Sequence, residues 1–233
     1  MWEILDTGMS SAERNMAIDA ELLAAAKVPT MHFYEWERDS ATFGHFIKPE
    51  GLLNVERAGE LGLDLAKRPT GGGVVFHMWD MAFSVVVPAC SPLFSKNTLD
   101  NYALINNLVL KAARSFLGEG MGLIPEDIPS IDGCCQNFCM AKPTKYDLVM
   151  DGKKIAGASQ RQTKGGFLHQ GTIALIMPEI DYLEAVLKEG TRVKEAMQTF
   201  TYPLLGKTAS RKELLDAKLT LKQLLMEYAT TKA

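Results

Sequence analysis

The segment from residue 145 to residue 159 constrains the fold more than any other part of the sequence. It reads KYDLVMDGKKIAGAS, two strand-like runs joined by Asp151-Gly152. An Asp-Gly pair between two such runs favours the positive φ angles of a tight hairpin turn. The chain therefore contains at least one antiparallel strand pair. Gly165-Gly166 predicts a second turn, which leads into a strand at residues 171–177.

Helical patterns alternate with strand patterns along the rest of the chain. Apolar spacing and capping residues predict helices at residues 11–27, 53–61, 99–120, 180–189, 191–199, 208–216 and 220–230. Short aromatic or apolar runs predict further strands at residues 31–36, 41–46 and 81–88. This arrangement predicts an α+β fold with a mixed or antiparallel central sheet flanked by helices.

Composition and charge exclude several classes of function. The 233 residues carry a formal net charge of −3, so no general basic field points to nucleic acid. No apolar stretch reaches the ~20 residues that a membrane-spanning helix needs. The first residues contain an early acid and lack the apolar core of a signal peptide. We therefore expect a cytoplasmic protein with no nucleic-acid or membrane partner.

Three of the four cysteines lie in the short stretch CCQNFC, as Cys134, Cys135 and Cys139. A disulfide framework is not expected in a reducing compartment. A zinc site would need a second ligand pair, and only Cys90 remains for it. The sequence therefore favours a catalytic thiol with incidental neighbours, and zinc is the weaker interpretation.

Four stretches predict a common pocket. They are RPTGGGVVFH at residues 68–77 and the segments around Cys139, Lys154 and His169. A glycine turn lets backbone amides approach a ligand, a lysine directed inward needs an acceptor, and a nearby cation favours a thiolate. Each feature also has a purely structural interpretation: a tight turn, a buried cysteine, a solvated lysine or a core histidine. From the residues alone we infer an enzyme that handles a small molecule or acyl group, with a candidate cysteine nucleophile.

The order of these stretches resembles the superfamily of lipoate–protein ligases, biotin–protein ligases and octanoyltransferases. RPTGGGVVFH resembles its Arg-x-Ser/Thr-Gly-Gly motif, which lines the acyl-chain pocket. DGKKIAGASQRQTKGGFLHQGTIAL resembles its second motif, with the lysine at Lys154, and ERNMAIDAEL resembles its Asn-Met-Ala-Leu-Asp helix. The resemblance implies a biotin/lipoate ligase-like catalytic domain at residues 1–200. Residues 201–233 are expected to form a helical C-terminal extension packed on the same domain.

Within this superfamily the sequence most resembles the cysteine-dependent octanoyltransferases. CMAKPTKYDLVMDGKKIAG is similar to the stretch that holds their nucleophile, and EGTRVKEAMQTF is similar to another of their segments. Ligases tend to have an asparagine, which helps to hold the nucleotide–metal complex, where this chain has Met81. Two features differ from the transferases: Gly73 is the ligase form of the glycine motif, and His169-Gln170 reverses the expected order.

The resemblance implies an acyltransferase of protein lipoylation. Octanoyl, or lipoyl, would pass from acyl carrier protein through a cysteine thioester to a lysine of a lipoyl domain or of the glycine-cleavage H protein. The alternatives are an ATP-dependent lipoate–protein ligase, which would need ATP and Mg, and a non-catalytic lipoyl- or acyl-binding protein. The transferase interpretation needs no cofactor and no metal.

The resemblance also assigns the site residues. Cys139 and Lys154 are the expected catalytic residues. The expected substrate-binding residues are Arg68, Thr70, Gly71, Gly72, Gly73, His77, Gly157, Ala158, His169 and Gly171.

Basic residues gather around the same region, although the whole chain is mildly acidic. They are Lys142, Lys145, Lys153, Lys154, Arg161 and Lys164. Because acyl carrier proteins and lipoyl domains are acidic, the outward members are expected to form a docking face that raises the association rate. A solvated hairpin surface is the alternative interpretation.

Overall fold

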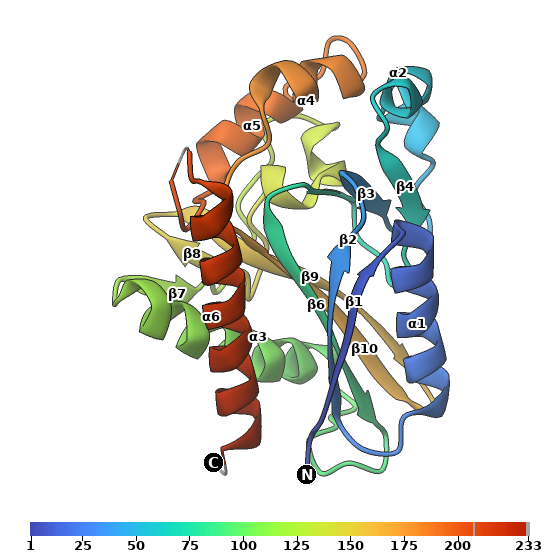
Figure 1. The fold of residues 1–233 in the computed structure, drawn as a ribbon, viewed down its shortest axis with the longest axis vertical. Helices are drawn as coiled ribbons and strands as arrows, with labels where there is room; N and C mark the ends of the chain where they lie inside the picture. Colours follow the sequence, from blue (N-terminus) through green and yellow to red (C-terminus); the bar gives the residue numbers. More distant parts are fainter. Residues whose placement is uncertain (207, 232–233) are drawn as a thin grey trace.

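The computed structural model describes residues 1–206 and 208–231. A seven-stranded sheet forms its centre, in the strand order β1-β2-β6-β10-β9-β8-β7 (Figure 1). Only β1 and β2 pair in parallel among these neighbours; the other pairs are antiparallel. The strands are β1 (Glu3–Ser10), β2 (Thr30–Trp36), β6 (Asp80–Pro88), β7 (Met121–Leu123), β8 (Leu148–Met150), β9 (Lys153–Thr163) and β10 (Gly166–Ala174).

A second, three-stranded sheet lies beside the first, in the order β4-β3-β5. Its strands are β3 (Ser40–Phe43), β4 (Asp64–Lys67) and β5 (Val74–His77). The helices are α1 (Ala12–Ala25), α2 (Val55–Glu60), α3 (Thr98–Leu117), α4 (Ile180–Val186), α5 (Val193–Phe200) and α6 (Arg211–Thr230). Short 3-10 turns at Cys135–Asn137 and Cys139–Ala141 interrupt the cysteine loop.

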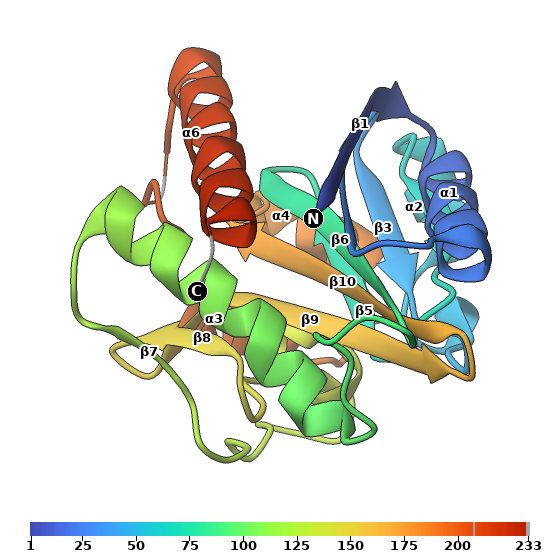
Figure 2. The same ribbon diagram turned by 90° about the horizontal axis from the view of Figure 1, so that it is seen from below.

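The two faces of the main sheet have different partners. Helices α3 and α6 pack on one face, where Phe33, Val85 and Ile173 join the largest hydrophobic cluster. Helix α1 packs on the other face together with the small sheet, as Figure 2 shows. There Tyr34 packs with Met16 of α1. Because side chains alternate along a strand, neighbouring residues such as Phe33 and Tyr34 contribute to opposite faces. The candidate site lies on the α1 side.

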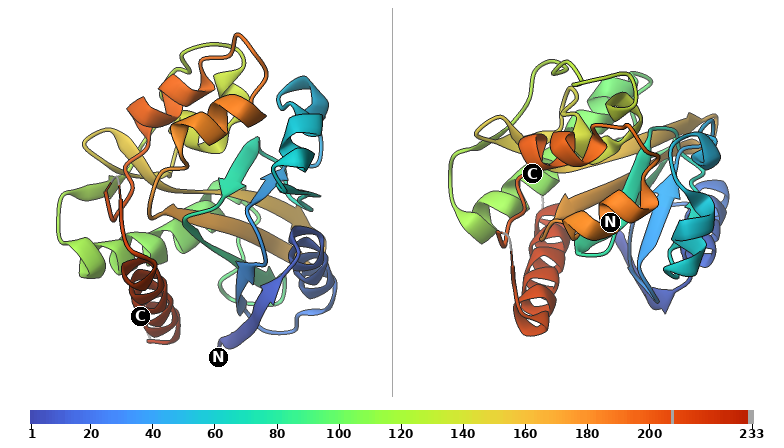
Figure 3. Two further views of the ribbon diagram at one scale, coloured as in Figure 1. Left: turned by 45° about the horizontal axis from the view of Figure 1, so that its top comes forward. Right: turned by 90° about the horizontal axis from the view of Figure 1, so that it is seen from above.

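A third cluster of apolar residues holds the cysteine loop in place. Phe138 of the loop, Phe76 of β5 and Leu183 of α4 are all buried in it. Figure 3 shows α4 and α5 (orange) gathered with the yellow-green cysteine loop at one end of the molecule. The loop is therefore packed between the small sheet and these helices rather than exposed as a free connection.

The fold prediction of an α+β domain with a mixed central sheet flanked by helices is confirmed. The hairpin prediction is also confirmed, since Asp151 and Gly152 have φ angles of 52° and 73° between β8 and β9. The prediction of separate helices at 208–216 and 220–230 is wrong, because α6 runs unbroken from Arg211 to Thr230. Its buried residues Leu214, Ala217, Leu221 and Leu225 form one continuous helical stripe.

Several strand limits also differ from the predicted ones. Strand β10 begins at Gly166, five residues before the predicted start at residue 171, and β3 ends at Phe43 instead of residue 46. Strand β3 ends just before Gly44, which passes so close to the glycine loop that a Cβ there would lie 2.0 Å from the Gly72 carbonyl oxygen. Strands β1, β4, β5 and β7 were not predicted from the sequence.

No helix within the described residues has the length and apolar character required to cross a membrane. The cytoplasmic location stays a prediction, and so does the division at residue 200. Residues 207 and 232–233 of the expected C-terminal extension lie outside the described residues.

Candidate active site

The three glycines of the RPTGGG loop have different physical roles. Gly72 has a φ of +82°, and a Cβ there would lie 3.7 Å from the sulfur of Cys139. At Gly73 a Cβ would lie 2.1 Å from the carbonyl oxygen of Asn137, so only glycine lets the cysteine loop approach this closely. Gly71 has open space around it and contributes its carbonyl oxygen as an acceptor for Arg68. The glycine loop therefore brings the backbone against the cysteine loop.

Arg68 organises the glycine loop from inside. Its guanidinium donates to the carbonyl oxygens of Thr42, Gly71 and Gly73 at 2.7–3.0 Å. Burial lowers the pKa of Arg68, and the charge and hydrogen bonding of the neighbouring Cys139 oppose that shift. Arg68 is thus a buried cation close to Cys139.

Cys139 opens the second 3-10 turn of its loop and is partly exposed. Of the four cysteines, which are all described, it alone lines a pocket together with the glycine loop. Cys135 is fully buried, and burial together with the Asp132 carboxylate raises the pKa of its thiol to about 12. Burial also raises the pKa of Cys134.

Lys154 lies on β9 next to the backbone of Cys139. Its ammonium donates to the Cys139 carbonyl oxygen at 2.8 Å and pairs with the Asp147 carboxylate at 2.7 Å. Thr144 donates its backbone N–H and its hydroxyl to the same carboxylate. The Lys154 and Asp147 side chains are 3% and 4% exposed. Because an unpaired charge is unfavourable in a buried position, each of the two side chains needs the opposite charge of the other.

Gly157 provides the space for this lysine. A Cβ at residue 157 would lie 2.4 Å from the ammonium nitrogen of Lys154 and 2.9 Å from a carboxylate oxygen of Asp147. Any larger residue at this position would therefore displace the ion pair.

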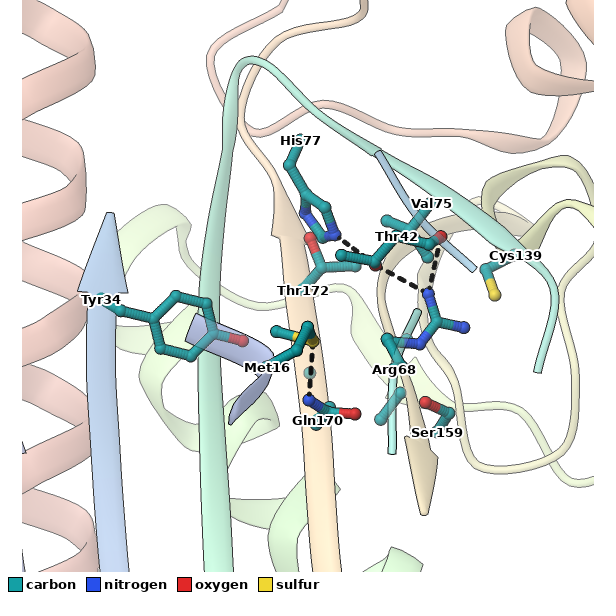
Figure 4. A pocket seen from close by; sticks show the side chains of 13 residues that line it. Met16, Tyr34, Thr42, Arg68, Val75, His77, Cys139, Ser159, Gln170 and Thr172 are labelled. Carbon is teal, nitrogen blue, oxygen red and sulfur yellow. Dashed lines mark hydrogen bonds between the residues drawn. The ribbon is translucent and has the colours of Figure 1, made fainter. Parts of the chain in front are cut away.

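Cys139 lies where two cavities meet. The inner pocket extends from Cys139 to Tyr34 between the two sheets (Figure 4). It is narrow, with a cavity volume of about 20 Å³, and its empty volume including the open part is about 360 Å³. Its lining residues are Met16, Tyr34, Thr42, Arg68, Val75, His77, Cys139, Gly157, Ala158, Ser159, Gln170, Gly171 and Thr172. The outer pocket, of about 670 Å³ on the same measure, is lined by the glycine loop together with Cys139, Lys142 and Lys154.

Most polar side chains of the inner pocket are hydrogen-bonded to other protein groups; the Arg68 Nε atom is buried without a partner among the described residues. His77 bonds Thr42 at 2.8 Å, and Thr42 also accepts from Arg68 (Figure 4). His77 also bonds Asp80 at 2.6 Å. Thr70 lies behind the wall and bonds both Ser159 and Gln170. With these groups satisfied internally, the surface offered to a ligand is mainly that of Met16, Tyr34, Val75, Ala158 and the glycines.

The structure brings together all the expected site residues except His169. His169 is fully buried against Tyr102 and Phe83, and it lines neither pocket of the described structure. Burial lowers its pKa to about 3. The neighbouring Gln170 lies at the inner pocket instead.

Seven lining residues were not predicted from the sequence: Met16, Tyr34, Thr42, Val75, Ser159, Gln170 and Thr172. One signal was available for two of them, because Ser159 pairs with Gln170 across the β9–β10 hairpin. Alternation from Gly157 puts Ser159 and its cross-strand partner on one face. His169, which was predicted for its chemistry, lies on the opposite face of β10.

Comparison with known proteins shows the family of the chain. Residues 11–228 match the family model described as the lipoyl protein ligase A/B catalytic domain, which is most of the chain. The chain belongs to this family. Octanoyltransferase LipM of Anoxybacillus flavithermus is 32% identical to it over 96% of this chain and 82% of the relative. The predicted superfamily, and the prediction of an enzyme of protein lipoylation, are confirmed.

Two solved members of the lipoate ligase group show the same fold. A lipoate-protein ligase A bound with ATP superposes with a TM-score of 0.68 at 22% identity, covering 100% of this chain and 96% of the ligase. A bipartite lipoate protein ligase from Thermoplasma acidophilum, described together with its E2 lipoyl domain, gives a TM-score of 0.67 at 21% identity. That match covers 100% of this chain and 93% of the archaeal one.

Proposed function

We propose that this member of the lipoyl ligase family is a cysteine-dependent octanoyltransferase. It takes octanoyl from the thioester of acyl carrier protein, holds it on Cys139, and passes it to a lysine of a lipoyl domain or of the glycine-cleavage H protein. The position of Cys139 carries the proposal, because the thiol borders both the mainly apolar inner pocket and the more polar outer pocket. The octanoyltransferase relative and the lipoyl-domain partner of the archaeal ligase support it.

In the first step the Cys139 thiolate attacks the carbonyl carbon of the incoming thioester. The carbon–sulfur bond to Cys139 forms, the bond to the carrier sulfur breaks, and the carrier thiolate leaves. The buried Arg68 cation lies close to the attacking sulfur. The acyl chain lies in the inner pocket, and the carrier arm lies in the outer one.

The oxyanion of the tetrahedral intermediate needs hydrogen-bond donors near Cys139. Lys154 uses two of its three ammonium protons on Asp147 and the Cys139 carbonyl, which leaves one for a substrate oxygen. Because the glycine loop also borders the outer pocket, its backbone amides are further candidates. Asp147 acts as a positioning residue that fixes the ammonium beside the nucleophile.

In the second step the neutral amine of the acceptor lysine attacks the Cys139 thioester. An amide bond forms, Cys139 leaves as thiolate, and the nitrogen loses one proton. Exchange of one thioester for another is nearly balanced and amide formation is favourable, so we propose that no nucleotide is needed. Met81, where ligases tend to have a metal-binding asparagine, is buried in the main core.

The test is mass spectrometry of the intact protein after incubation with octanoyl–acyl carrier protein. We expect one octanoyl adduct, located on Cys139, that is lost in Cys139→Ala and retained in the matched control Cys134→Ala. Addition of a lipoyl domain should discharge the adduct. ATP-dependent formation of AMP from free lipoate, unaffected by Cys139→Ala, would instead identify a ligase. If neither reaction occurs, the alternative of a non-catalytic lipoyl- or acyl-binding protein would be supported.

A further inference from the structure

The inner pocket ends at a side chain that also borders the outside of the molecule. Met16 of α1 lines the inner pocket and, on its other side, an open groove between α1 and β4. It is only 4% exposed. The groove has an empty volume of about 900 Å³ including its open part. Its floor is lined by Ala17, Ala20, Leu65 and Ala66, and Glu13 and Lys67 also border it.

Two long side chains line both cavities. One is Arg68, whose guanidinium is held by the carbonyl oxygens of Thr42, Gly71 and Gly73. The other, Met16, is the only aliphatic one of the two. It belongs to a small cluster in which Met16 packs with Tyr34 and with Ala12, Ala66 and Ala82. Alanine side chains are too short to close a channel, so the Met16 thioether is the part that fills the space. Shortening Met16 would join the pocket to the groove.

The residues around Met16 at this end of the pocket are held by specific contacts. The Tyr34 ring contacts His32 at 4.8 Å and Trp36 at 5.3 Å between ring centroids, which fixes its plane. Gln170 holds the Met16 sulfur at 3.2 Å and is itself anchored to the Asp19 carboxylate at 2.6 Å. Met16 is thus held in a defined position, although its side chain is unbranched and flexible.

We propose that Met16 sets the upper limit of acyl-chain length by closing the inner pocket against the groove. The inference rests on the proposed function in that the inner pocket takes the acyl chain from Cys139. The terminal methyl of an accepted chain stops against the Met16 thioether. A longer chain finds its path blocked by protein, whereas Met16→Ala gives it an exit into the partly apolar groove.

The expected effect follows from burial of additional methylenes. Each methylene that enters an apolar site strengthens binding by roughly fourfold. Because the groove is open to water, we expect about a tenfold gain for the four extra methylenes of dodecanoate in Met16→Ala. Octanoate, which ends at the former wall, should bind no more tightly than before.

Binding of free fatty acids tests this without requiring acyl transfer. In a Cys139→Ala background, calorimetry with octanoate, decanoate, dodecanoate and tetradecanoate gives the chain-length profile of each variant. Met16→Ala should shift the dodecanoate-to-octanoate affinity ratio by about tenfold. Met16→Val, which retains more of the side chain, should shift it less and guards against misfolding of the alanine variant. Carrier-dependent acylation of Cys139 is measured separately, so failure of the transferase proposal remains distinguishable.

A substitution in the groove provides a matched control. Ala20 is exposed and lines only the groove side. Ala20→Phe should leave the profile unchanged while Met16 is present, and should restore the short-chain limit when combined with Met16→Ala. An unchanged profile in both Met16 variants, or a shifted profile in Ala20→Phe alone, would overturn the proposal.

Discussion

At the scale of single residues, the two histidines proposed for the site have different surroundings. His77 has a hydrogen-bond partner at each ring nitrogen, Thr42 and Asp80. The Nε2 atom of His169 is buried with no partner among the described residues, and its Nδ1 atom lies 3.5 Å from Gln160. His77 therefore supports the pocket wall, whereas His169 is a neutral aromatic side chain of the core.

This difference predicts how stability depends on pH. Burial lowers the pKa of His169 from 6.5 to about 3, so the unfolded chain binds a proton more readily than the folded one. The contribution of the neutral His169 side chain to the free energy of unfolding is complete above pH 6.5. It is lost as the pH falls from 6.5 toward 3, by up to about 1.4 kcal/mol per pH unit. His169→Phe places another aromatic ring beside Tyr102 and Phe83, and it should reduce the loss of unfolding free energy at low pH.

The measurement is the free energy of unfolding in urea at several pH values between pH 7 and pH 4. His45→Gln, at an exposed loop position, is the control and should keep the wild-type curve. Parallel curves for His169→Phe and the wild type would contradict the assignment.

At the scale of elements, the β9–β10 hairpin carries the main contrast between what the sequence predicted and what it did not. The sequence predicted Lys154 on β9, the Asp151-Gly152 turn that leads into β9, and the glycine loop that borders the same site. These features could be predicted because turn chemistry and a family motif are local in sequence. The sequence did not predict which face of β10 borders the pocket, because alternation defines two faces without identifying the one that meets the pocket. The facing residues Met16 and Tyr34 come from distant elements, so no local pattern could assign them.

Two glycines of this hairpin predict separable effects. A Cβ at Gly157 would meet the Lys154 ammonium, whereas a Cβ at Gly171 would lie 2.5 Å from the Phe83 ring in the main core. Gly157→Ala should displace the oxyanion donor and reduce carrier-dependent acylation of Cys139 by ~10²–10³. Gly171→Ala should overpack the core and lower the free energy of unfolding by about 1–3 kcal/mol.

Urea unfolding and single-turnover acylation distinguish the two variants. Each glycine serves as the control for the other, since they lie on adjacent strands and gain the same methyl group. Full acylation by a folded Gly157→Ala protein would remove Lys154 from the proposed mechanism.

At the scale of the whole molecule, the charge around the site differs from that of the chain as a whole. The formal net charge is −3, yet the cysteine loop ends in Lys142 and Lys145 beside the outer pocket. Lys142 is partly exposed with its ammonium 3.7 Å from Asp127, and Lys145 is exposed. Lys154 is excluded from any docking face, because it is buried with Asp147. The outward lysines are therefore the ones that an acidic carrier would meet.

Reversal of these two charges tests the predicted docking face. Lys142→Glu/Lys145→Glu should slow acylation by octanoyl–acyl carrier protein several-fold at low salt, because long-range attraction raises the association rate. The difference from wild type should shrink at high ionic strength, where the Debye length falls to about 3 Å at 1 M salt. Lys27→Glu/Lys212→Glu changes the net charge equally at exposed positions on α6 and beyond the end of α1, and should leave the rate unchanged. Equal rates for the two double variants at low salt would show that the lysines are only a solvated surface.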